Sequence, residues 1–281
     1  MCTDGRCCSR DGWCGSSDEY CGYGCQSQCY PSLGHKVSDI ITSDLFYEML
    51  PRLGSSECPG NNFYTYDSFV QSASNFSEFG TTGDLDTRKR EIAAFLAHTS
   101  SVTAIEHFHH LQDPYSWGYS YVSDPWAETG DFDYCDKSDD RYPCAPGKKY
   151  MAEDSFSLNG ADLLNNPDFL SKNPEVSFES AFWFWMIPSK TMPSSHDIMT
   201  GQWVPTHSDY ESGWYPGFGL TTNVVTGGLA CGHGWNPDER DRIGFYTRFC
   251  DLMGVDAGHN LSCDFQRPFS TNITNNQLQT M

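Results

Sequence analysis

The chain has 281 residues, with 37 acidic side chains against 17 basic ones and a formal net charge of −20. An electrostatic field of that sign repels phosphate backbones and anionic membrane surfaces, which disfavours nucleic acids as partners. The sequence contains no run near the ~20 apolar residues that a bilayer-spanning helix needs, so we expect no membrane protein. The length suits one large domain, or one large and one small.

The positions of the cysteines divide the chain into a short, cysteine-rich N-terminal part and a longer remainder. Thirteen cysteines indicate an oxidising compartment, and the odd count leaves at least one thiol without an intramolecular partner. Seven of them lie within the first 29 residues: Cys2, Cys7, Cys8, Cys14, Cys21, Cys25 and Cys29. So short a segment cannot bury enough apolar surface to fold without cross-links. We predict a disulfide-held module over residues 1–30, a linker over 31–38, a larger domain over 39–269 and a polar, disordered tail over 270–281.

Further features are typical of a secreted glycoprotein. Glycosylation sequons begin at Asn75, Asn260 and Asn272, although such triplets also arise by chance. The chain opens without a signal peptide, so we expect a mature or N-terminally cut sequence.

The larger segment is predicted to be mainly helical. Capping residues, apolar spacing and a stop at Pro51 predict helices over residues 43–50, 86–110, 178–187 and 238–253. Ser43 or Asp44 is the expected cap of the first, and the third is apolar nearly all round, as in a buried helix. Long loops rich in glycine, proline and aromatic residues are expected over 113–133 and 210–221.

The N-terminal cysteine pattern is specific. It consists of Cys7-Cys8-Ser9-Arg10-Asp11-Gly12-Trp13-Cys14-Gly15, then Tyr20-Cys21-Gly22, then Gly24-Cys25-Gln26-Ser27-Gln28-Cys29, and it resembles the hevein-type chitin-binding domain. In that family a serine and three aromatic residues bind N-acetylglucosamine, because pyranose C–H faces stack on aromatic rings while a hydroxyl bonds the acetamido group. The resemblance assigns these roles to Ser9, Trp13 and Tyr20. Asp11 holds the third aromatic position and cannot stack, so we expect weaker binding. Alternatively, Trp13 and Tyr20 pack in the core.

The larger segment resembles the catalytic domain of plant class I chitinases, glycoside hydrolase family 19. The matching stretches include Phe79-Gly80-Thr81-Thr82-Gly83-Asp84, Tyr115-Ser116-Trp117-Gly118-Tyr119, Ser194-Ser195-His196-Asp197 and Asp241-Arg242-Ile243-Gly244-Phe245-Tyr246. The resemblance implies a mainly α, lysozyme-like domain with long disulfide-tied loops, which needs no cofactor. It also implies a monomer whose partner is chitin or chitooligosaccharides. Class I members often carry a vacuolar-sorting extension ending Thr-Met; this tail ends Thr280-Met281 without that extension's apolar core, so vacuole and apoplast both stay open.

The two resemblances imply a disulfide set: Cys2–Cys14, Cys7–Cys21, Cys25–Cys29, Cys135–Cys144 and Cys231–Cys263. Cys8 stays unpaired because the family's first cysteine is missing. Cys58 stays unpaired because its partner position holds Ser120, and Cys250 occupies the family's unpaired position.

Catalysis in that family requires two carboxylates, a protonated acid for the leaving oxygen and a base that activates water. The acid position holds Val102, which carries no proton; its other interpretation is a continuation of the apolar stripe of its helix. The base position holds Asp124, which is one methylene shorter than the family glutamate and could equally be a solvated loop carboxylate. Arg242 alone remains of the charged residues organised around the acid, since Ala230 replaces a glutamate.

These substitutions favour a chitin-binding, defence-related chitinase-like protein in which hydrolysis of β-1,4 bonds is lost or severely impaired. The alternative is an active inverting endochitinase that uses Asp124 as base and a substitute acid such as Glu106, one helical turn beyond Val102. A third possibility is a storage or cold-responsive surface protein for which chitin is irrelevant.

Two further clusters are weaker. Residues 106–110, Glu-His-Phe-His-His, gather imidazoles, but a metal site needs another ligand and no His-Glu-x-x-His spacing exists, so we expect a polar helix end and no metal. Ser195, His196 and Asp197 are consecutive and therefore cannot converge as a nucleophilic triad.

Overall fold

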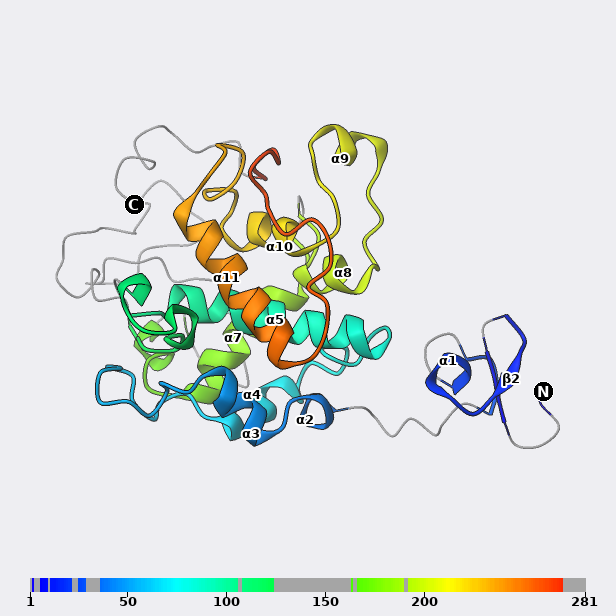
Figure 1. Ribbon diagram of the computed structural model, residues 1–281, viewed down its shortest axis with the longest axis horizontal. Helices are drawn as coiled ribbons and strands as arrows, with labels where there is room; N and C mark the ends of the chain where they lie inside the picture. The colour runs from blue at the N-terminus through cyan, green and yellow to red at the C-terminus, as the bar shows by residue number, and fades with distance from the viewer. Residues whose placement is uncertain are drawn as a thin grey trace.

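The computed structural model describes residues 2, 6–9, 11–21, 25–28, 36–105, 108–123, 163, 166–189 and 192–269 (Figure 1). The strands are β1 (Cys7–Cys8) and β2 (Cys14–Gly15), and the 3-10 turns are η1 (Phe108–His110), η2 (Pro114–Ser116) and η3 (Pro167–Phe169). The helices are α1 (Asp18–Cys21), α2 (Val37–Ile40), α3 (Ser43–Met49), α4 (Tyr66–Ala73), α5 (Leu85–Val102), α7 (Pro174–Met186), α8 (Ser195–Thr200), α9 (His207–Glu211), α10 (Phe218–Val225) and α11 (Pro237–Leu252). The predicted fold class, mainly α after a small disulfide-rich module, is confirmed.

The N-terminal module is held by cross-links around a minimal sheet. Strands β1 and β2 pair antiparallel, with Cys8 opposite Cys14. The structure contains the disulfides Cys2–Cys14 and Cys7–Cys21. Cys25 is also disulfide-bonded, while Cys29 lies outside the described residues, as do Cys135 and Cys144. Cys8 is buried and free.

Local capping signals determine where the helices of the large segment begin. The predicted helix over 238–253 is confirmed within one residue as α11, and that over 43–50 as α3, although Thr42 rather than Ser43 or Asp44 is its cap and accepts from the Leu45 amide. Helix α7 begins at Pro174, four residues earlier than predicted, because the Asn173 side chain accepts the Glu175 and Val176 amides.

Two of the predicted element boundaries were wrong. Helix α5 ends at Val102 and does not reach His110. The Thr103 hydroxyl donates to the Thr99 carbonyl, and the Thr103 carbonyl accepts the amides of Ser120 and Tyr121, so the returning chain occupies the position of the next helical turn. The second predicted loop, over 210–221, contains the start of α10, whose apolar residues pack in the core.

Helix α5 lies at the centre of the core, with α11 packed along it and α8 beside it (Figure 1). Phe95 of α5 stacks on Phe182 of α7 with ring centroids 4.2 Å apart and an interplanar angle of 2°. Phe79 meets the Phe182 ring edge-on at 4.7 Å. The opposite side of α7 is exposed at Phe184, so the prediction of a helix buried all round was wrong.

The fully buried Glu91 joins three segments of the core. Its Oε2 accepts the Gly80 amide at 2.9 Å, and its Oε1 accepts the Trp185 indole N–H at 3.2 Å. The same Oε1 lies 2.6 Å from Nδ1 of His196. Burial opposes a charge on His196, but the hydrogen bond and charge of Glu91 outweigh it and raise the pKa of the imidazole. Helices α5, α7 and α8 are thereby tied together through the hydrogen bonds of one carboxylate.

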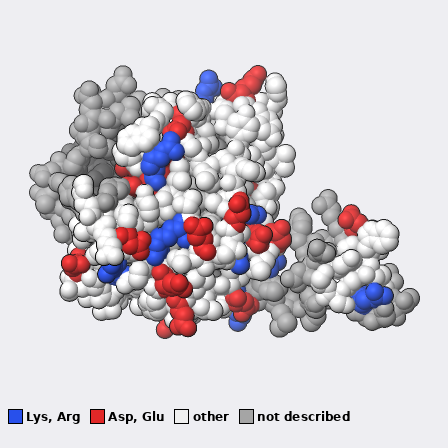
Figure 2. All heavy atoms as spheres, in the orientation of Figure 1, with Lys and Arg blue, Asp and Glu red and all other residues white. Residues whose placement is uncertain are grey.

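Among the described residues, no helix is long and apolar enough to cross a bilayer. On the face drawn in Figure 2, acidic and basic side chains of the described residues lie beside one another.

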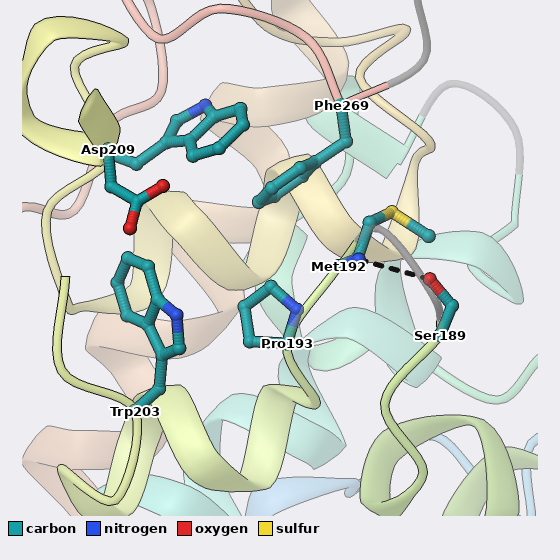
Figure 3. Close-up of a pocket in the computed structure, with 7 residues that line it drawn as sticks. Ser189, Met192, Pro193, Trp203, Asp209 and Phe269 are labelled. Atoms are coloured by element: carbon teal, nitrogen blue, oxygen red, sulfur yellow. Dashed lines mark hydrogen bonds between the residues drawn. The ribbon is translucent and has the colours of Figure 1, made fainter. Parts of the chain in front are cut away.

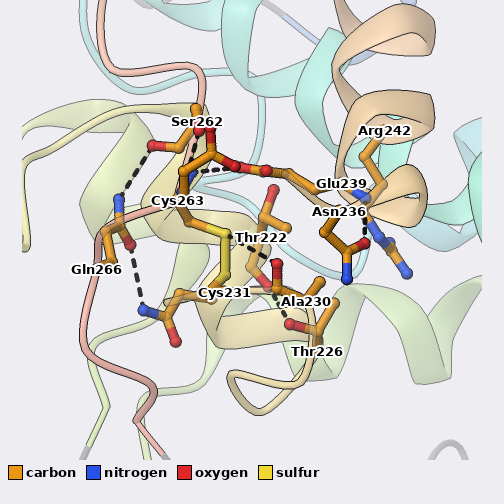
Figure 4. Close-up of a disulfide and its surroundings, with 12 residues drawn as sticks. Thr222, Thr226, Ala230, Cys231, Asn236, Glu239, Arg242, Ser262, Cys263 and Gln266 are labelled. Carbon is orange, nitrogen blue, oxygen red and sulfur yellow. Dashed lines mark hydrogen bonds between the residues drawn. A yellow bond between two sulfur atoms is a disulfide. The ribbon is translucent and has the colours of Figure 1, made fainter. Parts of the chain in front are cut away.

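A second buried carboxylate anchors the C-terminal segment next to the disulfide Cys231–Cys263 (Figure 4). Glu239, in the first turn of α11, accepts the Cys263 amide through Oε1. Its Oε2 and the Oδ1 of Asp264 are both buried without a donor. Burial and the neighbouring Asp264 raise the pKa of Glu239 to about 7. Two carboxyl groups in contact are stable when they share one proton, so Glu239 holds that proton while Asp264 pairs with Arg240.

The stacked core predicts a contrast between two phenylalanines of α7. Phe182→Ala removes a fully buried ring and is expected to lower the free energy of unfolding by about 3–5 kcal/mol. Phe184→Ala, at a position that is 45% exposed, is expected to cost less than about 1 kcal/mol. Chemical denaturation of both variants measures the difference, and equal losses would contradict this core.

The shared proton predicts a pH-dependent stability. Because the folded pKa of Glu239, about 7, lies above its ordinary value of 4.5, its contribution is fully present below about pH 4.5 and is lost as the pH rises through about 7. We expect the melting temperature of the wild type to fall over this window relative to Glu239→Gln, whose amide donates the same hydrogen bond at every pH. Parallel melting profiles of the two proteins would contradict the shared proton.

Candidate functional site

In the small module, Ser9 and Trp13 face each other across a tight turn. The Ser9 Oγ accepts the Trp13 amide at 3.1 Å, and the Ser9 amide donates to the Trp13 carbonyl at 2.8 Å. Gly12, with φ of +83°, supplies the left-handed residue that the turn requires. The Trp13 side chain is 72% exposed, so its interpretation as a core residue was wrong. An exposed indole held on a rigid turn is available to a ligand.

Tyr20 lies on α1 and is half-buried. Its ring covers Gly15 so closely that a Cβ there would lie 2.2 Å from the ring. Asp11 is exposed on the turn beside Trp13. The turn thus presents the Trp13 ring and one carboxylate, α1 contributes the half-buried Tyr20, and Ser9 is buried beneath the turn.

In the large segment, Val102, which the resemblance assigns to the acid position, lies at the very end of α5. Val102 is 65% exposed, so its interpretation as a continuation of the buried stripe was wrong. One turn earlier on the same helix face, His98 is buried and stacks on Phe218 with centroids 4.5 Å apart. The Val102 side chain therefore has solvent on one side and the His98 region on the other.

His98 belongs to a buried hydrogen-bonded chain with Arg242, and hydrogen-bond chemistry fixes every donor in it. The Arg242 guanidinium donates to His98 Nδ1 at 3.3 Å, so Nδ1 carries no proton. His98 Nε2–H then donates to the Thr221 hydroxyl at 2.9 Å, which donates to the Phe218 carbonyl at 2.7 Å. Burial, helped by the Arg242 charge, holds the pKa of His98 well below its usual value. This histidine is neutral and cannot serve as an acid.

Arg242 is 8% exposed and forms no ion pair with any described carboxylate. Its Nε is buried without an acceptor, and burial lowers its pKa to about 10, although Asp238 and Asp241 oppose that shift. A guanidinium in this state is adapted to a carboxylate partner, and no described side chain supplies one. Ala230, also buried, contributes only a methyl group to this region (Figure 4).

The remaining predicted site residues lie outside the described part of the chain. These are the base position Asp124 and the substitute acid Glu106, together with His107 of the imidazole cluster. Among the described residues, no group of three or more His, Cys, Asp or Glu side chains could hold a metal ion. His196 pairs with Glu91 rather than with its sequence neighbours Ser195 and Asp197.

The sequence prediction missed His98 and Thr221. His98 carried one local signal, since it lies four residues before Val102 and therefore on the same helix face. Thr221 carried none, because it reaches His98 only through the packing of α10 on α5.

Known protein families and curated relatives match this chain over almost its whole length. The family model "Chitinase class I" matches residues 40–263, and "Chitin recognition protein" matches residues 1–29. Endochitinase 1 of Theobroma cacao is 47% identical over 96% of this chain and 88% of its own. Inactive chitinase-like protein 1 of Hevea brasiliensis is 46% identical over 96% of this chain and 90% of its own.

One solved structure has a fold similar to that of this chain. The family GH19, class IV chitinase from Zea mays has a TM-score of 0.58 and 28% identity, covering 80% of this chain and 98% of that one. The helical scaffold, the N-terminal cysteine module and these matches lead to one conclusion: the chain belongs to the class I plant chitinases, with a chitin-recognition domain ahead of a glycoside hydrolase family 19 domain.

Proposed function

We propose that this protein binds chitin and has lost most or all of the ability to hydrolyse it. The observation that carries the proposal is Val102. A side chain without a titratable proton ends α5 at the acid position, and His98 one turn earlier is held neutral. Neither Val102 nor a neutral His98 supplies the proton that the leaving oxygen needs.

Arg242, which has no carboxylate partner among the described residues, supports the same conclusion. A guanidinium beside the acid position normally stabilises a carboxylate, and here it bonds a neutral imidazole instead. The names of the relatives do not decide between an active and an inactive chitinase. An endochitinase and an inactive chitinase-like protein are almost equally similar to this chain in sequence.

Binding is supported by the exposed indole of Trp13 and by the half-buried ring of Tyr20, which lies over Gly15. We further propose a secreted or vacuolar, monomeric defence protein; the cystines and the sequon at Asn75 favour the secretory route.

Hydrolysis is tested on chitin hexasaccharide, with an active class I chitinase measured alongside. Without a general acid, we expect a turnover on the order of 10²–10⁴-fold below the reference. Glu106→Gln and Asp124→Asn are expected to leave that residual rate unchanged. Turnover within about tenfold of the reference, abolished in either variant, would establish the active endochitinase and overturn the proposal.

Chitin binding is tested by retention on chitin beads. Trp13→Ala is expected to weaken retention about 30-fold, which corresponds to about 2 kcal/mol for a truncated aromatic contact. Trp235→Ala is the matched control, because Trp235 is 71% exposed but lies in the large segment. If both variants were retained like the wild type, or if the wild type did not bind, the small module would not be the chitin-binding element.

A further inference from the structure

The large segment contains a pocket with aromatic walls and few polar groups (Figure 3). Its volume is about 250 Å³, which lies below the range of drug-sized sites and suits a small ligand. The lining comes from the segment after α7, from α9 and the loops on either side of it, and from the C-terminal segment. The lining residues are Ser189, Met192, Pro193, Trp203, Asp209, Trp214 and Phe269.

Hydrogen bonds and ring contacts fix the aromatic walls. The Trp214 indole N–H donates to the Arg267 carbonyl at 2.7 Å. The centroids of the Trp214 and Phe269 rings are 4.3 Å apart, so these two rings form one continuous wall. The Trp203 amide donates to the Asp197 carbonyl at 3.0 Å and holds the other wall. The pocket is therefore formed before any ligand arrives.

The one charged side chain in the lining is a carboxylate. Asp209 uses Oδ2 at the start of α9, where it accepts the Thr206 amide at 2.7 Å and the Thr206 hydroxyl at 2.8 Å, and its Oδ1 accepts no hydrogen bond from a described residue. No basic side chain in the described part of the chain forms an ion pair with Asp209. In Figure 3 the carboxylate is directed toward the Trp203 ring. The pocket thus presents a negative charge beside aromatic rings, in a protein whose net charge of −20 attracts cations.

The shortage of hydrogen-bond acceptors determines which cation fits. A primary ammonium needs acceptors for its N–H groups, and a calcium ion needs about six oxygen ligands. Besides Asp209, the only oxygen among the lining side chains is the Ser189 hydroxyl, which already accepts the Met192 amide at 3.1 Å. A quaternary ammonium has no N–H to satisfy, and the faces of aromatic rings attract its charge. A neutral ligand would take water from the carboxylate without supplying a compensating charge.

We propose that this pocket binds a small molecule through a trimethylammonium group. The group lies between the Trp203 ring and the wall formed by Trp214 and Phe269, and the Asp209 carboxylate balances its charge. This site goes beyond the proposed recognition of chitin and does not depend on it, because the ligand, the residues and the interaction are all different.

The test titrates the full chain by calorimetry with three probes of similar size. Choline carries the trimethylammonium group, 3,3-dimethylbutan-1-ol is its neutral isostere, and ethanolamine carries a primary ammonium. We expect choline to bind at least about tenfold more tightly than either analogue. Equal or tighter binding of the neutral isostere would indicate a purely apolar pocket, and of ethanolamine a hydrogen-bonding amine site. Either result, or no binding of any probe, would overturn the proposal.

Trimethylammonium groups also occur on lipid headgroups, so phosphatidylcholine vesicles form a second arm. We expect free choline to bind and the protein to stay in the supernatant when the vesicles are sedimented. Sedimentation with the vesicles, without measurable binding of free choline, would overturn the assignment to a small molecule.

Two substitutions locate the site. Trp203→Leu removes the aromatic face but keeps an apolar side chain, and Asp209→Asn removes the charge but keeps an oxygen for the start of α9. Each is expected to weaken choline binding about tenfold. The matched controls are Trp235→Leu, at an exposed indole outside the lining, and Glu211→Gln, which removes the same charge from the same helix. Unchanged affinity in either pocket variant, or an equal loss in its control, would contradict the site, and two independent variants guard against misfolding of one.

Discussion

The large domain depends on a carboxylate that has no contact with water. Glu91 is buried on α5 and is satisfied only when the Gly80 amide, the Trp185 indole and the Nδ1–H of His196 all meet it. An unpaired carboxylate in this interior would cost several kcal/mol. Helices α7 and α8 therefore pack on α5 in the one arrangement that brings these donors together. That arrangement also fixes the direction of the later turns of α5, which carry His98 and Val102.

Local signals made most of the fold predictable. A threonine, aspartate or asparagine side chain caps most of the longer helices, and the Asn173-Pro174 pair that begins α7 was visible in the sequence although the prediction began later. The end of α5 was not predictable, because apolar spacing continues beyond it. The helix stops where Thr103 bonds the returning segment around Ser120, a contact that becomes available only once the chain has folded back.

The candidate sites also differ in whether the sequence alone could predict them. Ser9 and Trp13 are four residues apart, so a short motif was sufficient to find them. The chain from Arg242 through His98 to Thr221 spans two packed helix pairs and left almost no trace in the sequence. The pocket at Trp203 and Asp209 was unpredictable for the same reason: its walls come from separate segments, and the free Oδ1 is recognisable only when the capping role of Oδ2 is known.

Cys58 shows how this scaffold replaces one kind of bond by another. Its thiol lies 2.9 Å from the Ser120 hydroxyl, at the place where the resemblance implies a second cysteine. Around it, the Gly60 amide donates to the Ser120 carbonyl at 2.7 Å and the Tyr64 hydroxyl to the Tyr121 carbonyl at 3.2 Å. The contact between residues 58–64 and residues 120–121 consequently does not depend on a disulfide and is insensitive to reductants. A thiol–disulfide exchange that opened the small module would leave this part of the large domain closed.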